Sequence, residues 1–185
     1  GLQLALYSKV SQGDGRHANN AWLQEMPDPI STITWDNYLC MSPALAEKYS
    51  LKADDVVELK HSGGTVLIPV HVQPGMHPSV VAAAVGYGRK AAGKVGNEVG
   101  VDLYPMVQAD QGMLIYAGSA VEIRKTGRRY QLAITQWHHA TENRPIINDL
   151  TLDQFKQNAG AANHTDPHLR MDPVPTMWSV HEYKG

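Results

Sequence analysis

The sequence predicts a mainly β domain, built as a small barrel or sandwich, with a few short helices and an extended C-terminal tail. Several short runs rich in β-branched residues are separated by glycine and proline turns. Only two stretches carry clear helix-start signals. Many short strands with few helices are typical of small closed or sandwiched β folds.

The first half of the chain holds two expected strands and one expected helix. Residues 2–7 (LQLALY) predict a strand that runs into the polar loop SQGDGRHANN, and residues 32–35 (TITW) predict a second short strand. Ser42 followed by Pro43 marks a helix start, because serine is a good N-cap and proline suits the first helical position. This helix should end near Ser50.

A hairpin is the clearest feature of the middle of the chain. Residues 54–60 and 65–72 predict two strands joined by a Gly-Gly turn, with Pro69 marking an edge position or a bulge. Residues 80–85 (VVAAAV) predict a buried strand. Residues 86–100 contain five glycines and little apolar content, so we expect a loop there.

The last expected strands lie between residues 112 and 135. Residues 112–118 read as extended, and residues 119–135 as a final hairpin that turns at Thr126 and Gly127. The chain then becomes polar and irregular, apart from a short helix at 151–158 with a capping box of Thr151 and Gln154. We therefore expect a barrel domain at residues 1–135 and a tail or linker at residues 136–185.

Composition excludes several classes of function. The 185 residues carry a net charge of −2, so no basic surface predicts nucleic-acid binding. A single cysteine, Cys40, excludes a disulfide, a cysteine-ligated iron–sulfur cluster and a thiolate zinc site within this chain. No apolar run reaches the roughly 20 residues that span a bilayer, so we expect no direct membrane insertion. No signal peptide opens the chain, and we expect it to be a domain of a larger protein.

Motif searches do not predict a catalytic or metal site. The histidines at 138, 139, 164 and 168 suggest metal ligands, but two are adjacent and Pro167 lies between the other two, so solvated loop histidines are the simpler interpretation. Cys40 lies between bulky neighbours and is interpreted as a buried small hydrophobe. The segment GYGR at 86–89 lacks the spacing of a dinucleotide fingerprint.

Longer segments resemble one protein family. The stretches NNAWLQEMPDPISTITWDNYLCMSP, VQPGMHPSVVAAAVGYGRKAAGKVGNEVGVDLYP, TQWHHATENRPIINDLTLDQF and MWSVHEYKG are similar to the molybdopterin-oxidoreductase-like, iron–sulfur B subunit of alternative complex III. That subunit belongs to a quinol-oxidising respiratory assembly. The resemblance implies the double-psi β-barrel of the molybdopterin dinucleotide-binding domain, with iron–sulfur clusters in a following domain that this chain does not include.

The resemblance also implies where a cofactor site would lie. The wider family holds molybdopterin guanine dinucleotide, and an Asn-Pro-x-Asp helix start accepts hydrogen bonds from guanine. Here that start reads Ser42-Pro43-Ala44-Leu45, and leucine cannot accept such bonds. The later asparagine of the family is Asp102, whose charge would repel a pyrophosphate. The vestigial cofactor-binding candidates are therefore Asn19, Asn20, Ser42, Leu45, Gly86, Gly88, Arg89 and Asp102.

Three functions stay open at this point. The first is a structural scaffold, inert alone and without bound cofactor, which contacts other domains and subunits of a membrane-bound electron-transfer complex on the periplasmic face of the cytoplasmic membrane. The second is the cofactor-binding domain of an active molybdopterin oxidoreductase, with contacts from Asn19, Asn20, Arg89 and loop amides. For Arg89 the simpler interpretation is an ion pair with Glu98 or Asp102. The third is a free-standing carbohydrate- or peptide-binding β domain.

Overall fold

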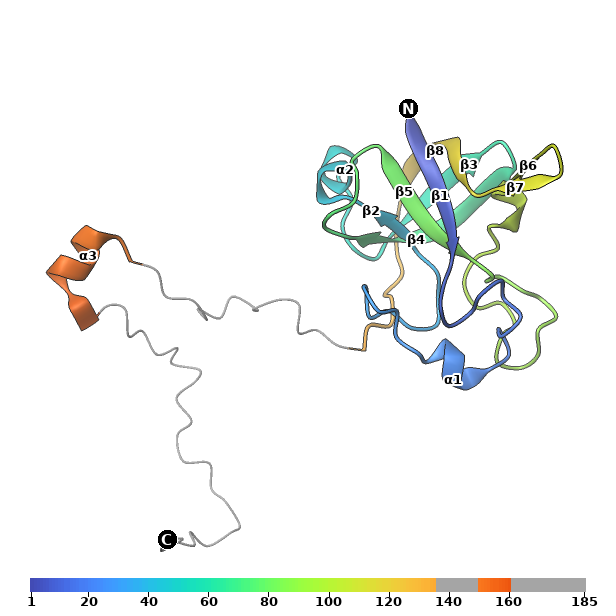
Figure 1. Cartoon of the computed structure of the whole chain (residues 1–185), viewed down its shortest axis with the longest axis horizontal. Coiled ribbons are helices and arrows are strands. Elements are labelled where there is room, and N and C mark those ends of the chain that lie inside the picture. Colours follow the sequence, from blue (N-terminus) through green and yellow to red (C-terminus); the bar gives the residue numbers. More distant parts are fainter. Residues whose placement is uncertain (136–149, 161–185) are drawn as a thin grey trace, which may run out of the picture. The chain divides into compact units, whose positions relative to one another are not determined.

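Six strands close into a barrel, as the sequence predicted for the fold class. The computed structural model describes residues 1–135 and 150–160, and the chain divides into two units after residue 136. Figure 1 shows the barrel of the first unit with its short helices and loops at the barrel ends. The barrel strands are β1 (Leu2–Ser8), β2 (Leu39–Met41), β3 (Asp55–His61), β4 (Gly64–Val72), β5 (Val80–Val85) and β8 (Ala117–Arg129).

The strand order around the barrel is β1-β5-β2-β4-β3-β8. Two neighbouring pairs are parallel, β1 with β5 and β2 with β4, whereas the other neighbours run antiparallel. Strand β8 closes the barrel because its first part pairs with β1 and the rest with β3. A closed barrel leaves no open sheet edge, which removes the exposed backbone groups that promote aggregation.

The core lies inside the barrel and follows the alternation of the strands. Val57 and Leu59 of β3 and Ile68 and Val70 of β4 are completely buried. The residues between them differ in burial: Glu58 is half-buried and Pro69 is buried. The same cluster takes in Leu45 from helix α2 (Pro43–Lys48), which covers one end of the barrel. Apolar burial of this kind supplies most of the favourable free energy of folding.

Short elements complete the described part of the chain. Helix α1 (Ala21–Gln24) and the 3-10 helix η1 (Tyr104–Met106) lie in long loops, and β6 (Gln108–Asp110) pairs with β7 (Met113–Ile115) in a separate hairpin. In the second unit, α3 (Leu152–Gln157) begins at the predicted capping box of Thr151 and Gln154. No helix in residues 1–135 and 150–160 has the length and apolarity that a membrane crossing requires.

Two predicted elements are wrong. Residues 32–35 form only an isolated bridge, Ile33 to Ile134, because Thr32 and Trp35 adopt positive φ and interrupt an extended backbone. The true strand in this region is β2. The final hairpin is instead the single strand β8, in which Gly127 (φ 78°) sits in a bulge opposite Asp55 and Val57. The turn signal was real, but it produces a local register shift rather than a reversal.

Pro69 lies inside β4 and pairs with Val56 of β3. On its other side the ladder to β2 begins only at Val70, so the missing N–H of proline costs no ladder bond there. The predicted edge position is therefore wrong, because β4 has a neighbouring strand on each side in the closed barrel.

Candidate functional site

Two loops form the end of the barrel where the candidate residues gather. Strands β1 and β5 are parallel neighbours, so the loops that follow them, residues 9–20 and 86–102, leave the barrel at the same end (Figure 1). The first loop is the polar segment before α1, and the second is the glycine-rich segment. We call these two segments the paired loops.

Glycines let the paired loops approach each other closely. A Cβ at Gly86 would lie 2.7 Å from the backbone nitrogen of Gly15 in the other loop. Within the glycine-rich loop, a Cβ at Gly88 would overlap the backbone of Asp102. Both glycines also adopt positive φ, 95° and 72°. The positions that a Cβ would take at Gly86 and Gly88 are thus occupied by this chain's own backbone.

Hydrogen bonds hold the paired loops together. Arg89 Nη2 donates to the Asp14 carbonyl at 3.0 Å, and the Tyr104 hydroxyl donates to the same oxygen at 2.8 Å. Asn19 Oδ1 accepts from the Val95 amide at 3.0 Å. Arg89 makes no ion pair with Glu98 or Asp102 within the described part of the chain. The predicted ion pair is therefore wrong, and Arg89 bonds to the Asp14 carbonyl instead.

Asn37 ties the glycine-rich loop to the barrel. This asparagine, fully buried at the entrance to β2, accepts from the Val101 amide at 2.8 Å. Its side-chain nitrogen donates to the carbonyls of Ala84 and Val101 at 2.8 and 2.9 Å. One side chain therefore satisfies three backbone groups, that of Ala84 buried and those of Val101 partly buried, a role that requires an amide with both a donor and an acceptor.

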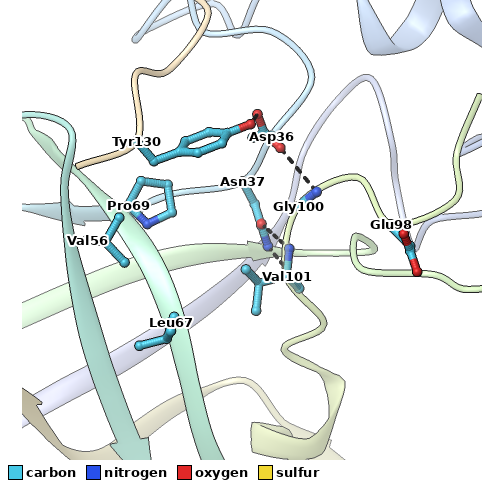
Figure 2. Close-up of a pocket in the computed structure, with 9 residues that line it drawn as sticks. All are labelled: Asp36, Asn37, Val56, Leu67, Pro69, Glu98, Gly100, Val101 and Tyr130. Atoms are coloured by element: carbon cyan, nitrogen blue, oxygen red, sulfur yellow. Dashed lines mark hydrogen bonds between the residues drawn. The ribbon is translucent and has the colours of Figure 1, made fainter. Parts of the chain in front are cut away.

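Asp36 makes the next contacts along the loop. One carboxylate oxygen accepts from the Gly100 amide at 3.1 Å, and the other accepts from the Tyr130 hydroxyl at 2.7 Å. Figure 2 shows these bonds at the edge of a hollow of about 220 Å³, which lies between the loop and strands β3 and β4. Its walls are mainly apolar, and its polar atoms come from residues already hydrogen bonded to one another, apart from Glu98: the lining is Asp36, Asn37, Val56, Leu67, Pro69, Glu98, Gly100, Val101 and Tyr130.

The first residue of the paired loops, Lys9, is a buried lysine. Lys9 is 5% exposed, donates from Nζ to the Asp36 carbonyl at 3.2 Å, and lies over the rings of Tyr38 and Tyr87 at 4.3 and 5.5 Å. Burial lowers the pKa of Lys9 to about 8, although the negative charges of Asp28 and Asp36 oppose this shift. Burial also raises the pKa of both tyrosines above the usual phenol range.

The start of α2 differs from a ligand-binding helix start. Ser42 is the N-cap, and its hydroxyl accepts the Leu45 amide at 3.1 Å, so the predicted helix start is confirmed. Leu45 is 3% exposed and belongs to the main core cluster. Its side chain is therefore a structural part of the barrel interior and cannot meet a ligand at the surface.

The remaining candidates have local roles. Asn20 is the N-cap of α1, and its Oδ1 accepts from the amides of Trp22 and Leu23. The exposed carboxylate of Asp102 accepts from the Tyr104 amide at 3.0 Å, which shapes the turn into η1. Asn19 and Asn20 also line an open hollow of about 440 Å³ together with Arg16, His17, Ala21 and Val95. Arg16 is paired with Asp14 at 2.9 Å.

Metal binding has no support among the residues that the structure describes, since they contain no group of three or more histidine, cysteine, aspartate or glutamate side chains suited to a metal. The histidines at 138, 139, 164 and 168 lie outside the described residues. Cys40 is buried, as predicted, and burial raises the pKa of its thiol to about 12.

The positions that the family resemblance assigns to the dinucleotide do not fit it. Leu45 offers no acceptor and is committed to the core, while the positions that a Cβ would take at Gly86 and Gly88 are occupied by backbone. An anionic Asp102 would oppose a pyrophosphate. Unpaired guanine donors in a buried site cost about 1–3 kcal/mol each, which is enough to remove most of the affinity.

The fold is that of a mainly β protein: a closed six-stranded barrel with a glycine-rich loop at one end. The sequence profile described as Molydopterin dinucleotide binding domain matches residues 10–110. The chain belongs to this family, whose members bind molybdopterin dinucleotide.

Among solved structures, the acetylene hydratase from Pelobacter acetylenicus is similar in fold, with a TM-score of 0.50 and 13% sequence identity. The similarity covers 68% of this chain but only 18% of the hydratase chain, so this chain spans less than a fifth of that relative's length. A comparison with curated protein sequences found no match.

Sequence reasoning missed the two residues that organise the site. Lys9 lies in a polar stretch where lysine is normally exposed, and nothing in the local pattern indicates burial. Asn37 precedes a short strand that was itself not predicted. Only the parallel pairing of β1 and β5 brings these residues under the glycine-rich loop.

Proposed function

We propose that this chain is a structural domain that keeps the family's barrel without holding the dinucleotide. The observation that carries this proposal is the burial of Leu45 in the barrel core at the helix start where the family pattern has an aspartate. The loop that would cover the ligand is held instead by internal bonds from Asn37, Asp36 and Arg89.

The proposed setting is a molybdopterin-oxidoreductase-like subunit of a respiratory, quinol-oxidising complex. This setting rests on the segments that resemble the B subunit of alternative complex III, and it places the domain on the periplasmic face of the cytoplasmic membrane. Electrons would pass through iron–sulfur centres and haems of other domains and subunits. In this setting the barrel contributes packing surfaces, and none of its residues takes part in redox chemistry.

Cofactor content is the direct test of the scaffold. We would purify the native polypeptide that contains this chain, hydrolyse it in acid, and measure released GMP together with molybdenum and tungsten. We expect far less than one equivalent of each per polypeptide. A dinucleotide-binding member of the family, purified from the same host, controls for cofactor supply. About one GMP per chain would overturn the scaffold.

A separate measurement tests the setting. Native membranes solubilised in mild detergent should yield the polypeptide in a large assembly that also carries haem and iron–sulfur centres and oxidises a quinol. Recovery of the polypeptide alone from the soluble fraction would contradict the respiratory setting, while leaving the cofactor result unaffected.

The second candidate function is binding of the dinucleotide tail at a different place on the same barrel end. The open hollow of about 440 Å³ favours it, because Asn19, Asn20 and Arg16 line a space of the size that small ligands occupy. Against it, Arg16 is already paired with Asp14, and the Asn19 oxygen is used by Val95. The GMP measurement separates the two candidates.

A further inference from the structure

Lys9 is a buried lysine that forms no ion pair within the described part of the chain. Its only protein acceptor within the described residues is the backbone carbonyl of Asp36. The faces of two tyrosine rings complete its surroundings. A buried ammonium without a carboxylate contact pays a large desolvation cost, which its neutral amine does not.

The position of Lys9 connects this cost to the glycine-rich loop. The residue it contacts, Asp36, holds the Gly100 amide through its carboxylate. The next residue, Asn37, holds Val101. Tyr87, which lies over Lys9 on one side, is itself part of the loop and follows Gly86. Solvation of Lys9 therefore requires this junction of Lys9, Asp36, Asn37 and Tyr87 to open, and opening releases the loop.

We propose that Lys9 is a positioning residue that makes closure of loop 86–102 depend on pH: burial in the closed junction disfavours the charged form of its amine, so protonation favours the open loop. This inference goes beyond the proposed function, since it applies whether or not the barrel binds a dinucleotide. It assigns a conformational role to a residue that touches none of the candidate cofactor positions directly.

Two carboxylates, a thiol and three phenols surround Lys9 at the junction. Asp28 and Asp36 present carboxylates to Lys9, and the pKa of Asp28 is lowered. Burial raises the pKa of the Cys40 thiol, and of Tyr38 and Tyr87, so these groups stay neutral. Tyr7, beside Cys40, has a raised pKa for the same reason.

The direction of the effect follows from linkage. Lys9 has a pKa of about 8 in the closed junction and its ordinary value of 10.5 when solvated. The open form therefore binds more protons, and a rise in pH from 8 towards 10.5 favours the closed form. Between pH 7 and pH 9 these two values predict a shift of about tenfold in the opening equilibrium.

Hydrogen exchange tests the proposal in the full 185-residue chain. Quench-flow labelling at pH 7 and pH 9, corrected for intrinsic exchange rates, gives the protection of the Gly100 and Val101 amides. We expect protection to rise about tenfold at pH 9, since opening becomes rarer. The amides of Val81 and Ala83 in the barrel strand β5 report global unfolding and serve as the internal reference.

Three variants separate Lys9 from general effects. Lys9→Met removes the charge at similar volume, so its loop should be highly protected and insensitive to pH. Lys9→Arg cannot lose its proton, so its loop should stay weakly protected at both pH values. Lys52→Met, at an exposed lysine, should behave as the unchanged chain does. Equal protection of the unchanged chain at pH 7 and pH 9, or a tenfold rise that persists in Lys9→Met, would overturn the proposal.

Discussion

Leu45 occupies the third position of α2, where its amide bonds to the cap and its side chain enters the core. These two roles are independent. The helix start depends on Ser42 and Pro43, whereas the type of side chain at position 45 determines whether it packs in the core or can contact a ligand. A leucine here strengthens the barrel at the expense of the acceptor that guanine would need.

Leu45→Asp should therefore unfold or severely destabilise the domain. The substitution removes a buried leucine and places a carboxylate in an apolar core, so we expect a loss of more than about 3 kcal/mol in the free energy of unfolding. Urea denaturation followed by circular dichroism measures this loss. Ala44→Asp is the matched control, because Ala44 is exposed one residue earlier on the same helix, where an acid favours the helix dipole. A mild effect of Leu45→Asp would mean that residue 45 can reach solvent.

Asn37→Leu tests the buried amide that holds the loop. The change leaves the Ala84 carbonyl and both backbone groups of Val101 without partners, at about 1–3 kcal/mol each. We expect a loss of roughly 3 kcal/mol or more by urea denaturation. Asn97→Leu is the control, since Asn97 bonds to two amides in an exposed turn that water can satisfy. Equal losses in both variants would show that burial of Asn37 is unimportant.

At the scale of elements, the two long loops behave as one unit because glycines allow their backbones to touch. Gly86 makes this contact with Gly15, and Gly88 is packed as closely against Asp102 within the glycine-rich loop itself, where it combines a positive φ with the absence of space for a side chain. Positive φ by itself is a moderate cost for alanine, whereas a backbone overlap forces a segment to move.

Gly88→Ala should thus cost more than Gly112→Ala. Gly112 has a similar φ of 82°, but a Cβ there meets nothing within 4 Å, so it isolates the cost of the backbone conformation. We expect about 1 kcal/mol for Gly112→Ala and at least about 2 kcal/mol more for Gly88→Ala, from thermal or urea unfolding. If the two variants lose the same stability, the glycine-rich loop is not packed around Gly88 as described.

Local sequence patterns predicted those elements whose burial and turns are encoded within a few residues. The β3–β4 hairpin has alternating apolar residues and a glycine-containing turn at Ser62 and Gly63, and α2 has its Ser-Pro start. Strand β2 has three residues, all of them buried, and is too short for any period to show. Gly127 reads as a turn in isolation, and only the pairing of β8 with β3 makes it a bulge.

At the scale of the whole molecule, the sequence indicated where this chain departs from the family pattern, but not the internal hydrogen bonds that hold the same barrel end. Leu45 and Asp102 stand in the sequence where the family resemblance implies other residues, so the missing contacts could be read directly. The bonds made by Asn37, Asp36 and Lys9 depend on residues far apart in sequence meeting at one barrel end. No local pattern encodes such a meeting.

Several groups at the same barrel end have shifted pKa values, so their ionisation changes the stability of the fold. Lys9 and the buried acids act in opposite directions, and we therefore expect stability to be greatest at alkaline pH. Lys9 has a lowered pKa of about 8, so the unfolded chain binds its proton more tightly and stability rises with pH above 8. Tyr7, Tyr38 and Tyr87 have raised pKa values, and Cys40 titrates near 12. These acids ionise first in the unfolded chain, near pH 9 to 10, and stability falls beyond that range.

We therefore expect the free energy of unfolding to rise by about 1.4 kcal/mol between pH 7 and pH 9, the energy of a tenfold shift, and to fall again above about pH 10. Urea denaturation at half-unit pH intervals measures the curve. In Lys9→Met the rise should vanish, whereas the alkaline fall should persist because the tyrosines and Cys40 are unchanged. A curve for Lys9→Met that still rises by the same amount would assign the effect to another group and remove Lys9 from its role in the loop junction.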